Sequence, residues 1–185
     1  MGGIRFTETL AGYLGEGDDH WSAWRAGRSA GRRARFTLTV YIPDVGALEA
    51  DPEHVGPARG PVWVADLGPS TTDGRVHLFC RRDGQKRLLY HLPFSSGGRP
   101  YILRGEKRLS GSRRRRWREM TTLYADLLSV EAGSESLLAR GVLTIGPWQV
   151  LLQALSFRPE GPSGVAAFVR DSLRFLRFSS REMGT

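Results

Sequence analysis

Several polar side chains fall inside strand-like segments, on faces that they share with aromatic and aliphatic residues. Glu8 alternates with Phe6 in one segment, and Lys107 alternates with Tyr101 in another. A third face of this kind is formed by Thr122, Tyr124 and Asp126. Apolar walls with a few oriented polar groups are typical of a cavity that binds a small molecule. The pattern therefore fits a barrel whose interior these faces line and, about equally well, a β-sandwich whose solvated outside they form.

These faces, with one tyrosine of a further strand, supply the candidate site residues. The ligand-binding candidates are Glu8, Tyr90, Tyr101, Lys107, Thr122 and Tyr124. The candidates for catalysis are Glu8, Lys107 and Tyr124, because a carboxylate, an amine and a phenol can exchange protons with a substrate. A charge in a barrel interior needs a partner, so Glu8 and Lys107 are expected to pair.

Other kinds of chemistry find little support in the sequence. Neither a phosphate-binding glycine loop nor a GxSxG nucleophile elbow occurs. The histidines are His20, His54, His77 and His91, and none has the four-residue spacing that places two metal ligands on one helix face. Cys80 is the only cysteine and is expected to be a small buried hydrophobe rather than a nucleophile. We therefore expect no cofactor and no metal ion.

Residues 111–120 read GSRRRRWREM, a basic run that contains an aromatic residue. A loop that binds nucleic acid or another anion would offer such a run, and the net charge of the chain is +8. The remaining arginines are scattered, however, and no nucleic-acid-binding motif is recognisable. We expect Arg113–Arg116 to lie on a solvated turn between two strands, with Trp117 as the anchor where the next strand begins.

The elements that would position all these residues are mostly strands. In the segment ARFTLTVYI, residues Phe36, Leu38, Val40 and Ile42 share one face, and the other face is largely polar. Similar segments follow, separated by turns such as RRDGQ and SSGG. A succession of about eight strands predicts an all-β fold, an antiparallel meander that forms a closed or nearly closed barrel, lipocalin-like in outline.

The C-terminal region changes character, and one or two helices are expected there. Pro147 suits the first turn of one helix, and Ser163 can cap a second. The apolar stripe of the second helix would consist of Val165, Phe168, Val169, Leu173 and Leu176. Such a stripe normally packs on its own sheet, and binding to a membrane surface is the alternative.

The chain is expected to be a single domain, residues 1–185, with a strand-rich barrel at about 4–146 and a helical segment at about 147–178. Residues 15–34 lack periodicity and are expected to form a long mobile connection, anchored in part by Trp21 and Trp24. No apolar run reaches the roughly 20 residues of a membrane span, and the N-terminus lacks the layout of a signal peptide. A cytoplasmic protein is therefore expected.

A series of short motifs resembles an accessory region of cholesterol-oxidase-like glucose–methanol–choline oxidoreductases. The motifs include RFTETLAGYL, DGRVHLF, LLYHLPF, GRPYILRGEK, W-x-x-x-TTLY and GVLTI. The matching positions are Phe6, Glu8, Gly12, Asp44, His54, Gly60, Gly74, Phe79, Tyr90, Tyr101, Gly105, Lys107, Trp117, Thr121, Thr122, Tyr124 and Gly141. The resemblance implies a free-standing all-β domain of the kind that accompanies enzymes acting on sterols and other lipid-like substrates. The flavin-binding fingerprint is missing, and Arg113–Arg116 replace the acidic or small residues expected there.

Three functional hypotheses follow. The first is a barrel that binds a hydrophobic small molecule or lipid-like ligand, with an oxidoreductase as the partner that the resemblance implies. The second is a cofactor-free cyclase or isomerase that acts on a polyketide- or terpenoid-like substrate in the same cavity. The third, binding of nucleic acid or another anion through Arg113–Arg116, ranks last. No membrane span is expected, although association with a membrane surface is compatible with the C-terminal helix.

Overall fold

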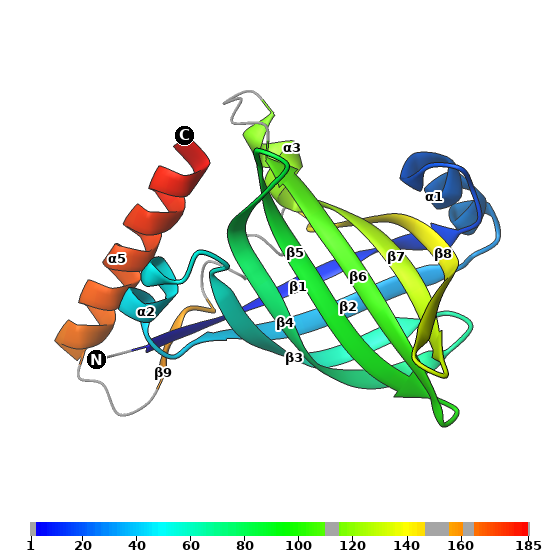
Figure 1. Cartoon of the computed structure of the whole chain (residues 1–185), viewed down its shortest axis with the longest axis horizontal. Coiled ribbons are helices and arrows are strands. Elements are labelled where there is room, and N and C mark those ends of the chain that lie inside the picture. The colour runs from blue at the N-terminus through cyan, green and yellow to red at the C-terminus, as the bar shows by residue number, and fades with distance from the viewer. Residues whose placement is uncertain (1–2, 110–114, 147–155, 161–164, 185) are drawn as a thin grey trace.

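The computed structural model describes residues 3–109, 115–146, 156–160 and 165–184. The chain forms a β-barrel with helices at its two ends (Figure 1). The strands are β1 (Gly3–Gly15), β2 (Arg33–Ile42), β3 (Val55–Val64), β4 (Gly68–Arg82), β5 (Gln85–Ser96), β6 (Arg99–Leu109), β7 (Thr122–Glu131), β8 (Ser134–Thr144) and β9 (Arg158–Glu160). The helices are α1 (His20–Ser29), α2 (Val45–Ala50), α3 (Arg116–Thr121) and α5 (Val165–Gly184).

Strands β1 to β8 form a closed antiparallel barrel. Each strand pairs with the next along the chain, and β1 closes the barrel by pairing with β2 on one edge and with β8 on the other. The pairing with β8 uses only Ala11–Gly15, while β9 pairs with Gly3–Arg5 at the other end of the same edge. The prediction of an all-β meander closed into a barrel is confirmed.

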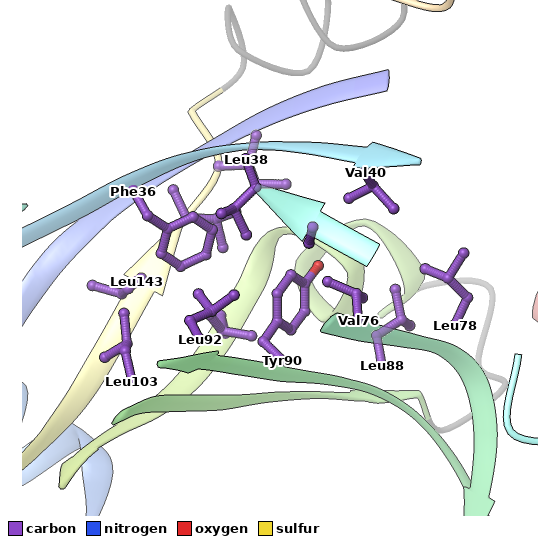
Figure 2. Close-up of a cluster of buried hydrophobic side chains, with 14 of the residues drawn as sticks. Phe36, Leu38, Val40, Val76, Leu78, Leu88, Tyr90, Leu92, Leu103 and Leu143 are labelled. Atoms are coloured by element: carbon purple, nitrogen blue, oxygen red, sulfur yellow. The ribbon is translucent and has the colours of Figure 1, made fainter. Parts of the chain in front are cut away.

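The barrel interior is built by the alternation that is visible in the sequence. Phe36, Leu38, Val40 and Ile42 all point inward from β2 and are almost completely buried. Figure 2 shows side chains of this kind from several strands packed against one another, with Tyr90 of β5 among them. Much of the interior is therefore filled by side chains, and the cavity described below lies at one end of the barrel.

At that end the pairing between strands stops before the strands do. β6 pairs with β7 only up to Glu106, so Lys107–Leu109 continue beyond the ladder. On β1, the edge that faces β8 and β9 has no strand partner between Phe6 and Leu10 within the described residues. Instead, the backbone N–H of Thr7 donates to Oγ of Ser156 at 2.8 Å. These unpaired edges leave room for side chains from α3, α5 and the chain before β9.

The prediction that residues 15–34 form a mobile connection is wrong, because they contain helix α1. Asp19 caps its first turn by accepting hydrogen bonds from the backbone N–H groups of Trp21 and Ser22. The helix lies close against β1 through small residues: a Cβ on Gly27 would lie 2.4 Å from the carbonyl oxygen of Leu14. Helix α1 therefore covers the outer face of β1 and β8.

Helix α5 confirms the predicted second C-terminal helix, but the prediction of its buried face is wrong. Val169 and Leu173 are each 49% exposed and Leu176 is 52% exposed, whereas Phe175 and Phe178 are buried. The side of the helix that carries the aromatic residues is buried because they pack on rings at the barrel end, including Phe6 and Phe79. Two ion pairs hold the helix in the same orientation. They join Arg174 to Glu49 and Lys86 to Glu182.

Several other predicted features fall outside the described residues. They are the helix expected from Pro147, the capping residue Ser163, and the side chains of Val165 and Phe168. Arg113 and Arg114 also lie outside, so their predicted turn is not described. The part that is described differs from the prediction: helix α3 precedes β7, and Trp117 lies on this helix with 60% of its surface exposed rather than buried as an anchor.

Candidate functional site

A cavity of about 230 Å³ lies at the end of the barrel where the strand ladders stop. It is enclosed by strands on one side and by α3, α5 and the chain before β9 on the other. Its lining consists of Phe6, Glu8, Leu78, Phe79, Leu88, Tyr90, Lys107, Trp117, Met120, Thr121, Ile145, Phe157, Phe175, Leu176 and Ser179. This lining is mostly apolar, with a small polar cluster.

The polar cluster is centred on an ion pair between β1 and β6. Nζ of Lys107 lies 3.2 Å from Oε2 of Glu8, and the two side chains are only 2% and 3% exposed. The pairing of Glu8 with Lys107 that the sequence predicts is confirmed. Neither charge would be tolerated here alone, because removal from water without a partner costs several kcal/mol, on the order of 3–5 for a broken buried pair.

Tyr90 completes the cluster from β5. The ammonium of Lys107 lies 5.1 Å from the centre of the Tyr90 ring, on its face, which is a cation–π contact. Burial, followed by the negative charge of Glu8 and a hydrogen bond to its carboxylate, raises the pKa of Tyr90 well above its ordinary value. The phenol therefore stays neutral. The charges of the Glu8 carboxylate and the Lys107 ammonium cancel each other beside it.

Aromatic rings form another part of the cavity wall. Phe6 stacks on Phe157 at 5.3 Å between ring centres, and Phe175 of α5 lies 5.9 Å from Phe6 and 6.0 Å from Phe157. Phe79 reaches the same wall because β4 is irregular between His77 and Cys80 and Phe79 adopts a positive φ of 57°. Bulges of this kind re-aim side chains that regular alternation would send elsewhere.

The cavity reaches the surface between α3 and α5. Trp117 and Leu176 line it and are also among the most exposed large hydrophobic residues of the described chain. Met120 and Thr121 of α3 contribute to the same edge. This opening, which we call the mouth, gives an apolar molecule a route to Tyr90 and the ion pair.

Tyr101 shares the inward face of β6 with Lys107, as predicted, but lies at the far end of that strand. The two are six positions apart along the strand, a distance of roughly 20 Å. Tyr101 stacks on Phe94 at 5.6 Å and lines a shallow depression together with residues of β4 and β5. The structure therefore does not bring Tyr101 to the cavity.

The expectation that Thr122 and Tyr124 face the interior is wrong. On β7 the residues of opposite parity, Leu123, Ala125 and Leu127, belong to the core, so Thr122 and Tyr124 do not line the cavity. The stronger apolar character of that set in the sequence is the signal that could have revealed the orientation.

Tyr124 instead lines a groove of about 390 Å³ on the outer face of the barrel. The guanidinium of Arg108 lies 4.7 Å from the centre of its ring, and Nε2 of His20 lies 3.3 Å from Oδ1 of Asp126 in the same groove. His77 and His91 also line this groove. Within the described part of the chain, no group of three or more histidine, cysteine or acidic residues is arranged to hold a metal ion.

Sequence reasoning missed the residues that complete the cavity beyond the strands. Phe157, Phe175, Met120 and Leu176 come from segments that were not assigned to the barrel interior. Cys80 behaves as expected of a buried thiol: burial raises its pKa, and its Sγ donates to the carbonyl oxygen of Arg87 at 3.5 Å. None of the described helices has the length and apolar character that crossing a membrane requires.

Comparison of the chain with protein-family models, with curated proteins and with solved structures found no match. The resemblance to the accessory region of glucose–methanol–choline oxidoreductases therefore stays a prediction. A β-barrel with a cavity is compatible with ligand binding, and the geometry of the cavity is the basis for a function.

Proposed function

We propose that this protein binds a small apolar molecule that has one uncharged polar group, in the cavity between the barrel, α3 and α5. The observation that supports this most strongly is the buried cluster of Glu8, Lys107 and Tyr90 at one side of an otherwise apolar cavity. A protein that needed only a stable core would be as stable or more stable with apolar residues at these positions. A site that orients a ligand needs such groups.

The balance of charge in the cluster favours a neutral ligand group. Glu8 already neutralises Lys107, so an entering carboxylate would lie close to the carboxylate of Glu8 and be repelled. A hydroxyl or carbonyl oxygen avoids this repulsion, because the ammonium of Lys107 has donors beyond the one that Glu8 uses. We therefore expect alcohols and ketones to bind more tightly than fatty acids of equal length.

The size of the cavity limits the ligand. A volume of about 230 Å³ lies below the roughly 300–1,000 Å³ that is typical of ligand pockets. A single chain or a small ring fits within it, and a longer ligand would project through the mouth between Trp117 and Leu176. The proposal is therefore a lipid-like chain or a terpenoid-sized ring rather than a whole enclosed lipid.

The experiment uses the fluorescent ketone prodan, displaced by straight-chain alcohols of increasing length. We expect saturable binding at one site, and displacement that strengthens by about 0.8 kcal/mol for each methylene group until the chain reaches the mouth. Glu8→Leu combined with Lys107→Met, which leaves no unpaired charge, should weaken prodan binding, whereas Tyr124→Phe, a change in the outer groove, should not. Equal affinity of prodan for the wild type and this double variant would argue against the cavity as the site.

The second candidate function is a cofactor-free isomerase or cyclase. The adjacency of a carboxylate and a neutral phenol in a largely apolar cavity favours it, because the first can accept a proton from carbon while the second donates one to oxygen. Deuterium exchange next to the carbonyl of cyclohexanone in heavy water tests this ability. Exchange should be faster with the wild type than with Glu8→Gln, and equal exchange with both proteins would remove this candidate.

A further inference from the structure

The outward side of α5 has a pattern that packing on the barrel does not explain. Phe175 and Phe178 point to the barrel, while Val169, Leu173 and Leu176 form a separate stripe in which each side chain is about half exposed. Spacings of four and three residues place these three on one side of the helix. A third side is basic and consists of Arg170, Arg174, Arg177 and Arg181, of which Arg174 already pairs with Glu49 while remaining half exposed.

The exposed stripe continues into the mouth of the cavity. Leu176 belongs both to the stripe and to the cavity lining, and Trp117 of α3 lines the same cavity with 60% of its surface exposed. We call Trp117, Val169, Leu173 and Leu176 the mouth patch. An apolar surface that borders the entrance of an apolar cavity is the arrangement expected where a ligand enters from an apolar phase.

We propose that the mouth patch docks on the surface of an anionic lipid bilayer, so that the cavity opens against the lipid. Helices that lie in a membrane interface combine an apolar stripe with basic residues on the polar side, as α5 does. Arg115 and Arg118 add exposed basic side chains beside Trp117. The net charge of +8 would further attract the protein to anionic lipid.

A second copy of the chain fits this surface less well. In a twofold dimer with antiparallel α5 helices the same patch meets itself, which would bring the arginine side of one α5 towards the arginine side of the other. Repulsion between these rows opposes the contact, whereas the phosphates of anionic lipids neutralise them. The charges therefore favour a bilayer as the occupant of this face.

The use of the mouth for ligand entry rests on the proposed function, but docking itself does not require it. If both hold, an apolar ligand can move from the bilayer to Tyr90 without crossing water. The patch then explains why large apolar side chains remain exposed around the entrance.

Sedimentation with vesicles tests the docking. The probes are vesicles of phosphatidylcholine alone and vesicles in which about a third of the lipid is phosphatidylglycerol. We expect the wild type to sediment with the anionic vesicles, at least about tenfold more strongly than with the neutral ones. The double variant Val169→Asp/Leu173→Asp should lose this binding by about tenfold or more; neither residue lines the cavity.

The matched control is Leu137→Asp/Leu138→Asp. These leucines of β8 are similarly half exposed, and the hairpin that contains them lies at the end of the barrel away from α5 (Figure 1). The control should sediment as the wild type does. The proposal is overturned if the wild type does not sediment with anionic vesicles or if both double variants lose binding equally. It is also overturned if, without lipid, the wild type is a dimer and Val169→Asp/Leu173→Asp is a monomer.

Prodan binding in solution separates this proposal from the proposed function. Val169→Asp/Leu173→Asp should bind prodan as the wild type does while failing to sediment with vesicles, which also shows that the variant is folded. Vesicle binding without prodan binding would refute the ligand cavity and leave the docking intact. Prodan binding without vesicle binding would refute the docking alone.

Discussion

Glu8 and Lys107 are separated by 99 positions in the sequence, yet the ammonium of one lies 3.2 Å from the carboxylate of the other inside the barrel. The two strands that hold them, β1 and β6, are not neighbours in the sheet, so the pair crosses the interior. The contact exists only because the barrel is closed. It also supplies the charges that give the cavity a preferred orientation for a ligand.

The ion pair should show strong coupling in a double-mutant cycle. Glu8→Leu alone leaves the ammonium of Lys107 buried without its partner, and we expect a loss of about 3–5 kcal/mol in the free energy of unfolding. Glu8→Leu combined with Lys107→Met should recover most of this loss, because no uncompensated charge remains. Urea unfolding of the four proteins measures the coupling; additive losses would show that the two charges do not interact.

Close packing of α1 on β1 should make Gly27 intolerant of a side chain. A Cβ at this position would lie 2.4 Å from the carbonyl oxygen of Leu14, which is backbone and cannot move aside. We expect Gly27→Ala to lower the free energy of unfolding by about 1–3 kcal/mol, despite the better helix propensity of alanine. Ser29→Ala, in the exposed last turn of α1, is the control and should stay within about 0.5 kcal/mol of the wild type. An unchanged Gly27→Ala would contradict this packing.

His91 should titrate below the ordinary histidine pKa of 6.5. Burial lowers its pKa, and Arg75 and Arg104 on the two adjacent strands lower it further. Because the folded-state pKa is depressed, the contribution of His91 to stability is present above the unfolded-state pKa and is lost as the pH falls through the folded-state value.

The shift of His91 can be followed by NMR titration of its ring protons. Arg104→Gln should raise the pKa of His91 towards 6.5, because one of the two neighbouring positive charges is gone. Arg99→Gln, at the start of the same strand, serves as the control and should leave the titration unchanged. A His91 midpoint at or above 6.5 in the wild type would be inconsistent with the structure.

Cys80 should report on global unfolding. The thiol is buried and its pKa is raised by burial, so the reactive thiolate is doubly disfavoured in the folded protein. We expect Ellman's reagent to react at least about a hundredfold faster in denaturant than in buffer, since reaction requires opening of the barrel. Rapid labelling of the native protein would mean that β4 is more accessible than the structure indicates.

Much of the barrel was predictable because its strands alternate clearly. In β2 the apolar residues from Phe36 to Ile42 stand at every second position, and a period of two fixes both the element and its buried face. The inward position of Glu8 and Lys107 followed from the same parity, and their pairing followed from the need to compensate a buried charge. These inferences depend on local pattern and elementary electrostatics alone.

The predictions that were wrong concern strands and helices in which two different faces could each have been buried. Tyr124 was assigned to the interior because it shares a mixed face with Thr122 and Asp126, but Leu123 and Ala125 occupy the inward face of β7. On α5 two apolar faces compete for the barrel, and only the tertiary partners of Phe175 and Phe178 decide which is buried. Helix α1 was missed because small residues, Ala23 and Gly27, form its buried side and give little hydrophobic signal.

Photolabelling with a long-chain alcohol that has a diazirine in its chain shows whether the cavity at the α3–α5 end binds an uncharged lipid-like molecule. The labelled peptides, located by mass spectrometry, should be those of the cavity wall, with Phe6, Met120 and Phe175 among the modified positions. Excess unlabelled alcohol should suppress this labelling, and a fatty acid of the same length should suppress it less. Labelling confined to the outer groove around Tyr124, or spread over the surface without competition, would contradict the account.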